Sequence, residues 1–464
     1  MGSWNTTTSI LVHPRSAGFG PLSQRTQATM NRPANSYDFD FAVAGGGPAG
    51  TSAAICLAQK GHRVVLFEKE QFPRFHIGES LLSTANDAFA TLGVADRMEA
   101  ACFPPKWGAR LYTPDGQTGR GVDFTSASGI TRAKTYQVCR EQFDAILMER
   151  AREVGVEVRE GHRVSGCEFD SEAATLEFAS ANDNGSVRVR ALVDASGRHG
   201  LVAKKFGLRK DEPMLANIAV FSHFSAVPRL AGDRPDDIRL VARADAGWFW
   251  LIPISPELTS VGVVIPMKRY MQLEHGSPDA MLQGAFDDTP FMAELMRGAR
   301  REWPVRVEKD FSYSASSYAG DRWILAGDAG SFLDPVFSSG VSIAMESGIE
   351  AATALDRAGA RNAFQAASFA AFSRRQSKRF RAFRRFVVGF YSPQFRDLFF
   401  SPEPPTILFR AVVTVLAGNW NPGLWTSAMN EIFFFLVALQ KRFSPSTRLF
   451  RRDATAGYPT EDAA

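Results

Sequence analysis

The sequence is poor in the residues that mark secreted and metal-binding proteins. Its 464 residues include only four cysteines and seven histidines. The cysteines form no C-x-x-C pair and show no metal-ligand spacing: they are Cys56, Cys102, Cys139 and Cys167. This pattern argues against a disulfide scaffold and predicts free thiols in a reducing compartment. We therefore expect a cytoplasmic protein without a metal site.

Long hydrophobic runs are also missing. The apolar run Ile432–Leu439 is far shorter than the roughly 20 residues that span a bilayer. The net charge of +4 is too small to indicate a nucleic-acid partner. The first 37 residues contain no Asp or Glu and lack the apolar core of a signal peptide. We expect residues 1–37 to be a disordered tail, or the result of a start codon assigned too early.

The first strong pattern is a glycine loop between a strand and a helix. Residues 38–44 change from alternating to wholly apolar, as a buried parallel strand does. The loop Gly45-Gly46-Gly47-Pro48-Ala49-Gly50 matches G-x-G-x-x-G and leads into a predicted helix over 49–60. A second strand, residues 62–67, is followed by Glu68. The pattern predicts a Rossmann-type dinucleotide site.

Each part of this loop has a predicted role in binding the cofactor. Gly45 allows the tight turn, Gly47 lets the backbone approach the pyrophosphate, and Gly50 lets helix and strand pack closely. Ala49 lies at the helix N-terminus, where free N–H groups face the phosphates. Glu68 is placed to bind a ribose hydroxyl. The loop alone does not distinguish FAD from NAD.

Periodicity predicts further layers around this unit. A helix is expected over 140–153, and alternating stretches over 160–195 and 215–265 predict an antiparallel sheet beside the Rossmann core. Residues 323–328 are expected to return to the core as a buried strand, followed by a helix that begins near Gly340.

From about residue 360 the chain is predicted to be helical. Phe380, Phe383, Val387 and Phe390 mark one face at helical spacing. The segment 374–385 holds seven basic residues, which form either a solvated helix face or a dock for an acidic partner or anionic membrane. These residues are Arg374, Arg375, Lys378, Arg379, Arg381, Arg384 and Arg385.

Three further segments resemble flavoprotein monooxygenases. Leu325-Ala326-Gly327-Asp328-Ala329-Gly330 resembles the G-D-A motif of that family, in which the aspartate contacts the ribityl chain. Val193-Asp194-Ala195-Ser196-Gly197 resembles its D-A-x-G turn, and Arg140 stands where its cofactor-contacting arginine lies. The resemblance implies that the glycine loop binds FAD. The sequence contains no second G-x-G-x-x-G motif that would indicate a separate nicotinamide-binding domain.

Residues 247–253, Gly-Trp-Phe-Trp-Leu-Ile-Pro, contain W-x-W-x-I-P, and here the sequence resembles the flavin-dependent halogenases of the tryptophan halogenase superfamily. The resemblance implies that Trp248 and Trp250 separate the flavin from the substrate. On a strand the two side chains share a face. The plainer alternative is an aromatic strand packed in a core.

Residues 332–340 resemble the second motif of that family, F-x-x-P-x-x-S-x-G. The resemblance implies that Ser339 and the Gly340 N–H bind halide, with Val341 against the cofactor. A helix N-terminus is a suitable anion site, although Ser339 is also typical of an ordinary N-cap.

The segment Arg74-Phe75-His76-Ile77-Gly78-Glu79-Ser80 is similar to the family's G-E-S segment near the isoalloxazine, with Arg74 and Ile77 as expected cofactor contacts. Family members often continue with Pro where this chain has Ser83. Phe103-Pro104-Pro105-Lys106-Trp107 places the catalytic lysine of the family at Lys106. Its amine would hydrogen-bond hypohalous acid or form a haloamine, and burial would lower its pKa toward neutrality. The alternative is a surface lysine.

The resemblance implies an activity. A separate NAD(P)H-dependent flavin reductase supplies reduced FAD, oxygen and chloride or bromide yield hypohalous acid, and Lys106 directs electrophilic halogenation. Tryptophan halogenases carry Glu where this chain has Phe337. The chain therefore resembles the phenol/pyrrole-type branch, and we expect a phenol or pyrrole, free or on an acyl or peptidyl carrier protein, in secondary metabolism such as antibiotic biosynthesis.

The expected architecture is α/β, with a Rossmann-type FAD-binding core of the flavoprotein monooxygenase type over residues 38–355. An antiparallel sheet from about 100–135 and 210–310 is inserted, and a helical, substrate-covering region follows over 356–464. Two alternatives share this fold: a flavin hydroxylase or reductase, and a non-catalytic flavin-binding partner protein. W-x-W-x-I-P, the halide loop and Lys106 favour the halogenase.

Overall fold

The structure is a computed structural model that describes residues 37–117, 119–272, 276–309, 312–399 and 406–443. The expected disordered tail lies outside these residues, apart from Tyr37. The described residues, from Tyr37 to Phe443, belong to one compact unit. In the described part of the chain, no helix is both long and apolar enough to cross a membrane.

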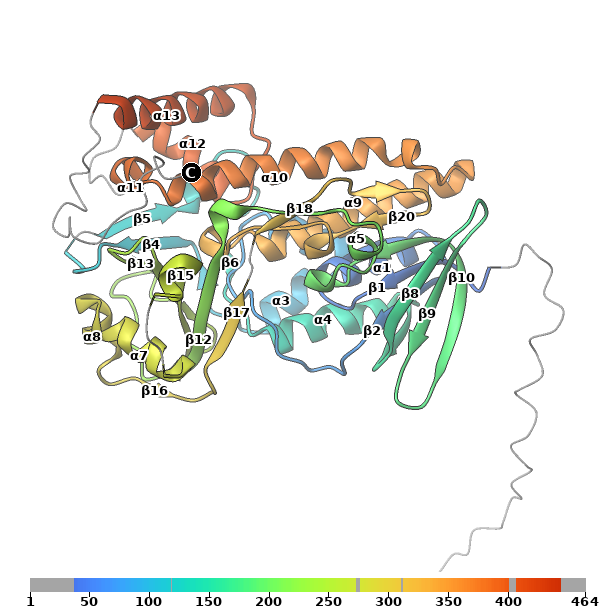
Figure 1. The fold of residues 1–464 in the computed structure, drawn as a ribbon, viewed down its shortest axis with the longest axis horizontal. Helices are drawn as coiled ribbons and strands as arrows, with labels where there is room; N and C mark the ends of the chain where they lie inside the picture. Colours follow the sequence, from blue (N-terminus) through green and yellow to red (C-terminus); the bar gives the residue numbers. More distant parts are fainter. Residues whose placement is uncertain (1–36, 118, 273–275, 310–311, 400–405, 444–464) are drawn as a thin grey trace, which may run out of the picture. The chain divides into compact units, whose positions relative to one another are not determined.

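The first sheet carries the predicted strand–loop–helix unit (Figure 1). Its central strands pair in parallel and are almost wholly buried, as their continuous apolar runs predict. In spatial order the strands are β19 (Ala319–Gly320), β20 (Trp323–Leu325), β10 (Asn184–Asp194), β1 (Phe39–Ala44), β2 (Val64–Glu68) and β7 (Glu157–Glu160).

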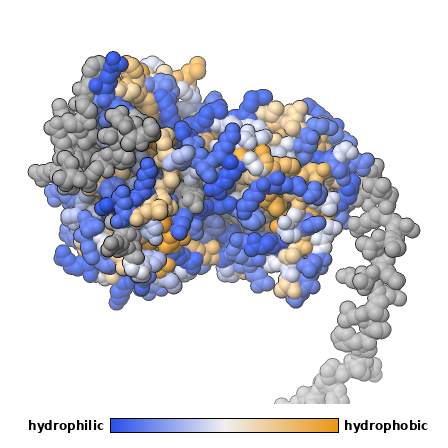
Figure 2. Space-filling view, in the orientation of Figure 1, coloured by the Kyte–Doolittle hydropathy of each residue, from blue (hydrophilic) through white to orange (hydrophobic). Residues whose placement is uncertain are grey.

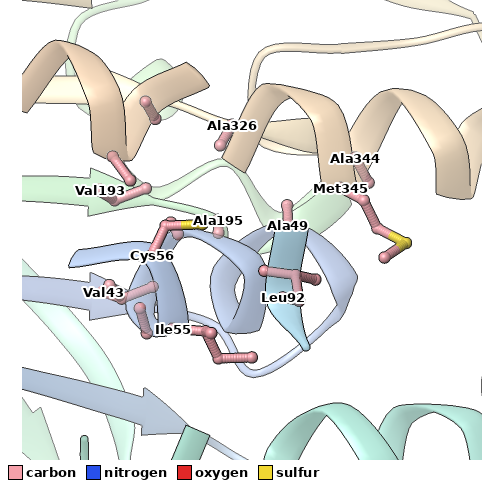
Figure 3. Packing of buried hydrophobic residues seen from close by; sticks show 14 of the residues in the cluster. Val43, Ala49, Ile55, Cys56, Leu92, Val193, Ala195, Ala326, Ala344 and Met345 are labelled. Carbon is pink, nitrogen blue, oxygen red and sulfur yellow. The ribbon is translucent and has the colours of Figure 1, made fainter. Parts of the chain in front are cut away.

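Small residues let two helices pack closely beside this sheet. They are α1 (Pro48–Gln59) and α9 (Gly340–Arg361). A Cβ added at Gly348 of α9 would lie 2.2 Å from the Ala49 carbonyl oxygen, so the two backbones nearly touch. Ala49, Ala195, Ala326 and Ala344 lie together at this crossing in Figure 3. α4 (Arg140–Glu153) also contacts α1.

The alternating stretch over 160–195 belongs to this first sheet, so its expected place in the second sheet is wrong. β8 (Arg163–Phe169) and β9 (Ala174–Ala179) form an antiparallel hairpin that pairs with the first half of β10. The second half of β10 pairs in parallel with β1. Alternation reveals a strand with one exposed face, but it does not reveal which partner the strand joins.

A second, mostly antiparallel sheet includes strands from both segments that were expected to be inserted, about 100–135 and 210–310. Its order is β16-β12-β15-β14-β13-β4-β5, β17 pairs with β12, and the β13–β4 pair is parallel. The strands are β4 (Gly108–Tyr112), β5 (Gly119–Asp123), β12 (Asn217–Ser225), β13 (Ile238–Ala242), β14 (Trp248–Pro253), β15 (Leu258–Pro266), β16 (Arg300–Arg301) and β17 (Arg306–Lys309).

The two faces of β14 pack against different layers. Phe249 and Leu251 pack with residues of α7 (Pro278–Asp287) and α8 (Pro290–Met296). Trp248 and Trp250 face the other way, into a cluster with the C-terminal helices. The alternation of strand side chains thus places both tryptophans on the face of the sheet that packs against the C-terminal helices.

Shorter elements complete the connections. Lys106 lies on β3 (Pro105–Lys106), which pairs with β6 (Thr135–Tyr136). A three-stranded sheet contains β11 (Arg209–Asp211), β18 (Tyr313–Ala315) and β21 (Ser331–Phe332). The short helices are α2 (Ala85–Leu92), α3 (Ala95–Ala100), α5 (Leu201–Lys205) and α6 (Met267–Tyr270).

The C-terminal part is helical, as the sequence predicts. Its helices are α10 (Ala370–Phe390), α11 (Pro393–Phe399), α12 (Thr406–Leu416) and α13 (Leu424–Phe443). The predicted apolar face of α10 is buried in the same cluster as the two tryptophans. The helices therefore cover the face of the second sheet that carries Trp248 and Trp250.

Several basic residues of the 374–385 segment on α10 form ion pairs within the molecule. Arg375 and Arg379 both pair with Glu350, Arg384 pairs with Glu212, and Arg385 pairs with Glu431 of α13. These pairs favour an ion-paired helix face over a dock for an acidic partner. Large apolar side chains do reach the surface on α13, over which Figure 2 shows hydrophobic residues: Leu424, Trp425, Ile432, Phe435 and Leu439.

Candidate active site

Glycine is required at two positions of the 45–50 loop. Gly45 has a φ of +110°, and a Cβ there would lie 2.2 Å from the Ala195 carbonyl oxygen. A Cβ at Gly50 would lie 1.9 Å from the Gly45 carbonyl oxygen. At Gly47 a Cβ would meet only the Arg74 guanidinium, at 3.7 Å. The loop is thus tightly packed on its inner side and open beside Gly47.

The open side coincides with the uncapped N-terminus of α1. Gly47 is the N-cap residue and has no side chain that could accept from the free N–H groups of the first turn. That turn also contains no acidic residue. This terminus fits a pyrophosphate. Glu68 is buried at the end of β2 and accepts bonds from Gly46 N, at 2.7 Å, and Glu70 N, at 3.0 Å. Its remaining lone pairs fit a ribose hydroxyl.

Arg74, Ile77 and Arg140 come together around a carboxylate that the sequence analysis missed. The Arg140 guanidinium donates to both oxygens of Asp144, each at 2.8 Å, and also to the Ile77 carbonyl. Arg74 lies 3.1 Å from the same carboxylate. The i,i+4 spacing of Arg140 and Asp144 on α4 is the signal that would have revealed this pair.

The G-D-A turn lies directly against the start of α1. Gly327 has a φ of +59°, and a Cβ there would lie 2.9 Å from the Ala49 Cβ. Burial raises the pKa of the next residue, Asp328, to about 6, against the opposing charges of Arg198 and Arg140. Val341, in the first turn of α9, faces Gly78. These segments converge as an FAD site requires.

The Ser339-Gly340 turn leaves the N-terminus of α9 uncapped. Ser338 has a φ of +56°, and Ser339 is buried at the N-cap position. The Ser339 hydroxyl makes no cap bond, so the interpretation as an ordinary serine cap is wrong. A Cβ at Gly340 would have only Phe332 within reach, at 4.0 Å. A buried hydroxyl beside free N–H groups fits an anion.

The two tryptophans of β14 stand side by side in the interior. Their ring centroids are 6.0 Å apart, and both side chains are buried. Trp250 donates from Nε1 to the Ser260 hydroxyl, at 3.1 Å. Trp248 donates to the hydroxyl of Tyr391, at 2.8 Å, a partner from the C-terminal helices that the sequence analysis missed.

Lys106 is buried, which rules out the surface alternative. Its side chain is 1% exposed, and its amine donates to the Ser80 hydroxyl at 2.8 Å. Loss of hydration lowers the pKa of Lys106 to about 7, and the charge of Asp237 opposes this shift. The expected burial and near-neutral pKa are therefore found, while the catalytic role stays a prediction.

A second buried pair lies beside the lysine. Glu79, which precedes Ser80, makes a 2.7 Å bond to His223 of β12. No spacing pattern in the sequence could reveal this pair, because the two residues lie on separate elements 144 positions apart.

The predicted residues therefore fall into two groups. The cofactor and halide groups meet around the starts of α1 and α9, whereas Lys106 lies with Ser80 at the end of the G-E-S segment. That segment connects the groups, because it runs from Arg74 to Ser80. In the described part of the chain, no hydrogen bond joins Lys106 to Ser339 or Gly340.

Comparison with known proteins decides what this site belongs to. A protein family described as "FAD binding domain" matches residues 38–364. A solved flavin-dependent brominase superposes with a TM-score of 0.77 at 32% identity, covering 87% of this chain and 99% of the other. The pyrrole-2-carbonyl-[peptidyl-carrier protein] brominase of Pseudoalteromonas luteoviolacea is 35% identical over 322 residues, which are 69% of this chain and 78% of that protein. The chain belongs to the flavin-dependent halogenases.

Other members differ in halide and substrate. The corresponding chlorinase of Pseudomonas fluorescens is 32% identical and covers 72% of this chain and 79% of its own length. A tryptophan 2-halogenase of Chondromyces crocatus is 35% identical, over 68% of this chain and 60% of its own length. This halogenase is thus an FAD-dependent enzyme that uses halide to halogenate an aromatic substrate, and the predicted fold class is confirmed.

Proposed function

We propose that this halogenase acts on an electron-rich ring of the pyrrole or phenol type, presented by a peptidyl carrier protein, with Lys106 as its catalytic lysine. The observation that carries the proposal is the buried Lys106 amine, with a pKa near 7, in a chain that also buries the Trp248–Trp250 pair. Phe337 in place of a glutamate and the pyrrole–carrier substrates in the names of two relatives support the substrate class.

In this proposal the protein binds, separates and positions the reactants. Bound FAD, reduced by a separate NAD(P)H-dependent reductase in the cytoplasm, supplies the oxidation of halide by oxygen. Ser339 and Gly340 hold the halide through the N-terminus of α9. Trp248 and Trp250 keep the organic substrate away from the flavin.

Lys106 then holds the halogen for transfer. A protonated amine donates a hydrogen bond to hypohalous acid, whereas a neutral amine forms an N–halogen bond and releases water. With a pKa near 7, both forms are available at neutral pH. The Ser80 hydroxyl holds the amine in place by accepting a hydrogen bond from it.

The carrier part of the proposal is tested with matched substrates. Pyrrole-2-carboxylate is supplied free, as a short pantetheine thioester, and tethered to a peptidyl carrier protein, together with bromide, FAD and a flavin reductase. We expect bromination of the tethered ring at least about 100-fold faster than that of the free acid, since binding the carrier supplies orientation. Equal rates with all three forms would contradict carrier presentation and leave the halogenase activity intact.

The ionisation of Lys106 gives a second test. Asp237 accepts bonds from Trp107 N and Gly108 N, and its charge raises the pKa of Lys106. Asp237→Asn keeps an acceptor oxygen but removes that charge, so we expect the pKa of Lys106 to fall by about one unit and the protonated fraction at pH 7 to drop.

The measurement is the pH profile of halogenation together with an NMR titration of the 13C-labelled lysine side chains. The Lys106 signal is the one missing in Lys106→Met. The neighbouring Asp236→Asn, which removes a more exposed carboxylate paired with Arg229, is the matched control. Superimposable titrations of wild type and Asp237→Asn would refute the coupling.

A further inference from the structure

One largely buried side chain, Tyr391, connects the tryptophan pair (Trp248 and Trp250) to the halide turn, which is the segment from Asp334 to Gly340. Tyr391 directly follows α10, and its hydroxyl accepts a bond from Trp248 Nε1 at 2.8 Å. The same hydroxyl lies 2.8 Å from Asp334 Oδ2. Asn217 Nδ2 lies within bonding distance of both, at 3.0 Å from the hydroxyl and 2.8 Å from the carboxylate.

The direction of each bond follows from the chemistry of the groups. The indole N–H and the amide NH₂ only donate, and a carboxylate only accepts. The hydroxyl proton of Tyr391 is therefore directed at Asp334, while the hydroxyl oxygen receives Trp248 and Asn217. With Asp334 ionised, each bond of this network has one direction.

Asp334 transmits this order to the halide turn. It is fully buried, and its Oδ1 accepts a bond from Val336 N, which fixes the 3₁₀ turn Pro335–Phe337. That turn leads through Ser338, with its positive φ, to Ser339 and Gly340. Burial raises the pKa of Asp334, and bonds from Tyr391 and Asn217 oppose this shift.

A second contact ties the same C-terminal segment to the tryptophan strand. Arg396 of α11 is 1% exposed, and its guanidinium donates to the carbonyl of Phe390, at 2.8 Å. It also donates to the carbonyl of Ala246, at 2.8 Å, in the turn just before Trp248. Arg396 therefore ties the residue before Tyr391 to the turn before Trp248, and this contact helps to fix the position of the Tyr391 hydroxyl.

We propose that Tyr391 is a positioning residue for halide. Through Asp334 it sets the conformation of the turn that carries Ser339 and Gly340, and through Trp248 it fixes the position of that turn relative to the tryptophan pair. The C-terminal helices would then complete the halide site as well as cover the second sheet. The inference rests on the proposed role of Ser339 and Gly340.

The variant that tests it is Tyr391→Phe, which keeps the ring and removes the hydroxyl. We expect the KM for bromide to rise by at least about fivefold, while the KM for the aromatic substrate changes less than about twofold. The matched control is Tyr318→Phe, another buried tyrosine, whose hydroxyl is not among the partners of Trp248 or Asp334. A merely structural loss would not separate the two KM values.

A binding measurement removes the dependence on turnover. Chloride affinity of the FAD-loaded protein is measured by 35Cl NMR line broadening for the wild type, Tyr391→Phe and Ser339→Ala. Weakened binding in both variants supports the inference, and weakened binding in Ser339→Ala alone overturns it. If Ser339→Ala binds chloride as the wild type does, the halide site of the proposed function fails instead.

Poor folding of Tyr391→Phe would be recognised by loss of bound FAD. In that case Asp334→Asn serves as the second variant, because it keeps an acceptor oxygen for Val336 N and removes the carboxylate oxygen that receives the Tyr391 hydroxyl. An unchanged bromide KM in a folded Asp334→Asn variant would also overturn the inference.

Discussion

Replacing Lys106 with methionine should lower halogenation by roughly 1000-fold and leave FAD binding and oxygen consumption close to those of the wild type. Methionine has a similar length and fills the buried space that Lys106 occupies, so the fold is kept. The loss follows because the variant has no amine to hold hypohalous acid or to form an N–halogen bond.

Two controls separate this loss from damage to the protein. Lys134→Met removes a lysine that pairs with Glu99 at the surface and should halogenate normally.

The free energy of unfolding of the wild type should also rise as pH increases from about 7 to 10.5, because in that window the unfolded state binds a proton that the folded Lys106 has released. Lys106→Met should lack this gain. Substantial halogenation by the variant would remove Lys106 from the mechanism.

The second large effect is expected at Gly50. In Gly50→Ala the new Cβ would lie 1.9 Å from the Gly45 carbonyl oxygen and 3.1 Å from Val43 Cγ1, in the tightest part of the cofactor loop. Backbone atoms cannot rotate away as a side chain can. A strain of about 3 kcal/mol on the bound state corresponds to roughly 100-fold weaker FAD binding.

The measurement is FAD affinity by flavin fluorescence, together with urea unfolding. Gly284→Ala is the matched control: it lies in α7, nothing lies within 4 Å of its added Cβ, and the change should stabilise the helix by about 0.4–1 kcal/mol. Tight FAD binding by Gly50→Ala would mean that the cofactor site does not depend on the close packing of Gly50 against Gly45.

The sequence predicted the local features of the fold well. The strand, glycine loop and helix at 39–59 are consecutive, and glycine is required at Gly45 and Gly50 for reasons that the chain itself contains. Partner choice was harder. The 163–194 strands alternate like an exposed antiparallel sheet, yet β10 changes partner along its length, from β9 to β1. Periodicity records exposure and does not record which strands pair.

The site was predictable where a motif was continuous in sequence. Lys106 was expected to be buried because its neighbours are apolar, and it is. The residues that support the motifs were missed: Asp144, Glu79 with His223, and Tyr391 with Asp334. Apart from Asp144, these pairs join elements far apart in the chain, so only the folded structure brings them together.

The most direct test of the account compares the product masses of wild type and Lys106→Met. Each is given FAD, a flavin reductase, oxygen, bromide and the carrier-tethered pyrrole. The account predicts a product with the paired isotope pattern of bromine and no added oxygen for the wild type, and unreacted pyrrole for the variant. An oxygenated product without bromine, or equal bromination by both proteins, would contradict it.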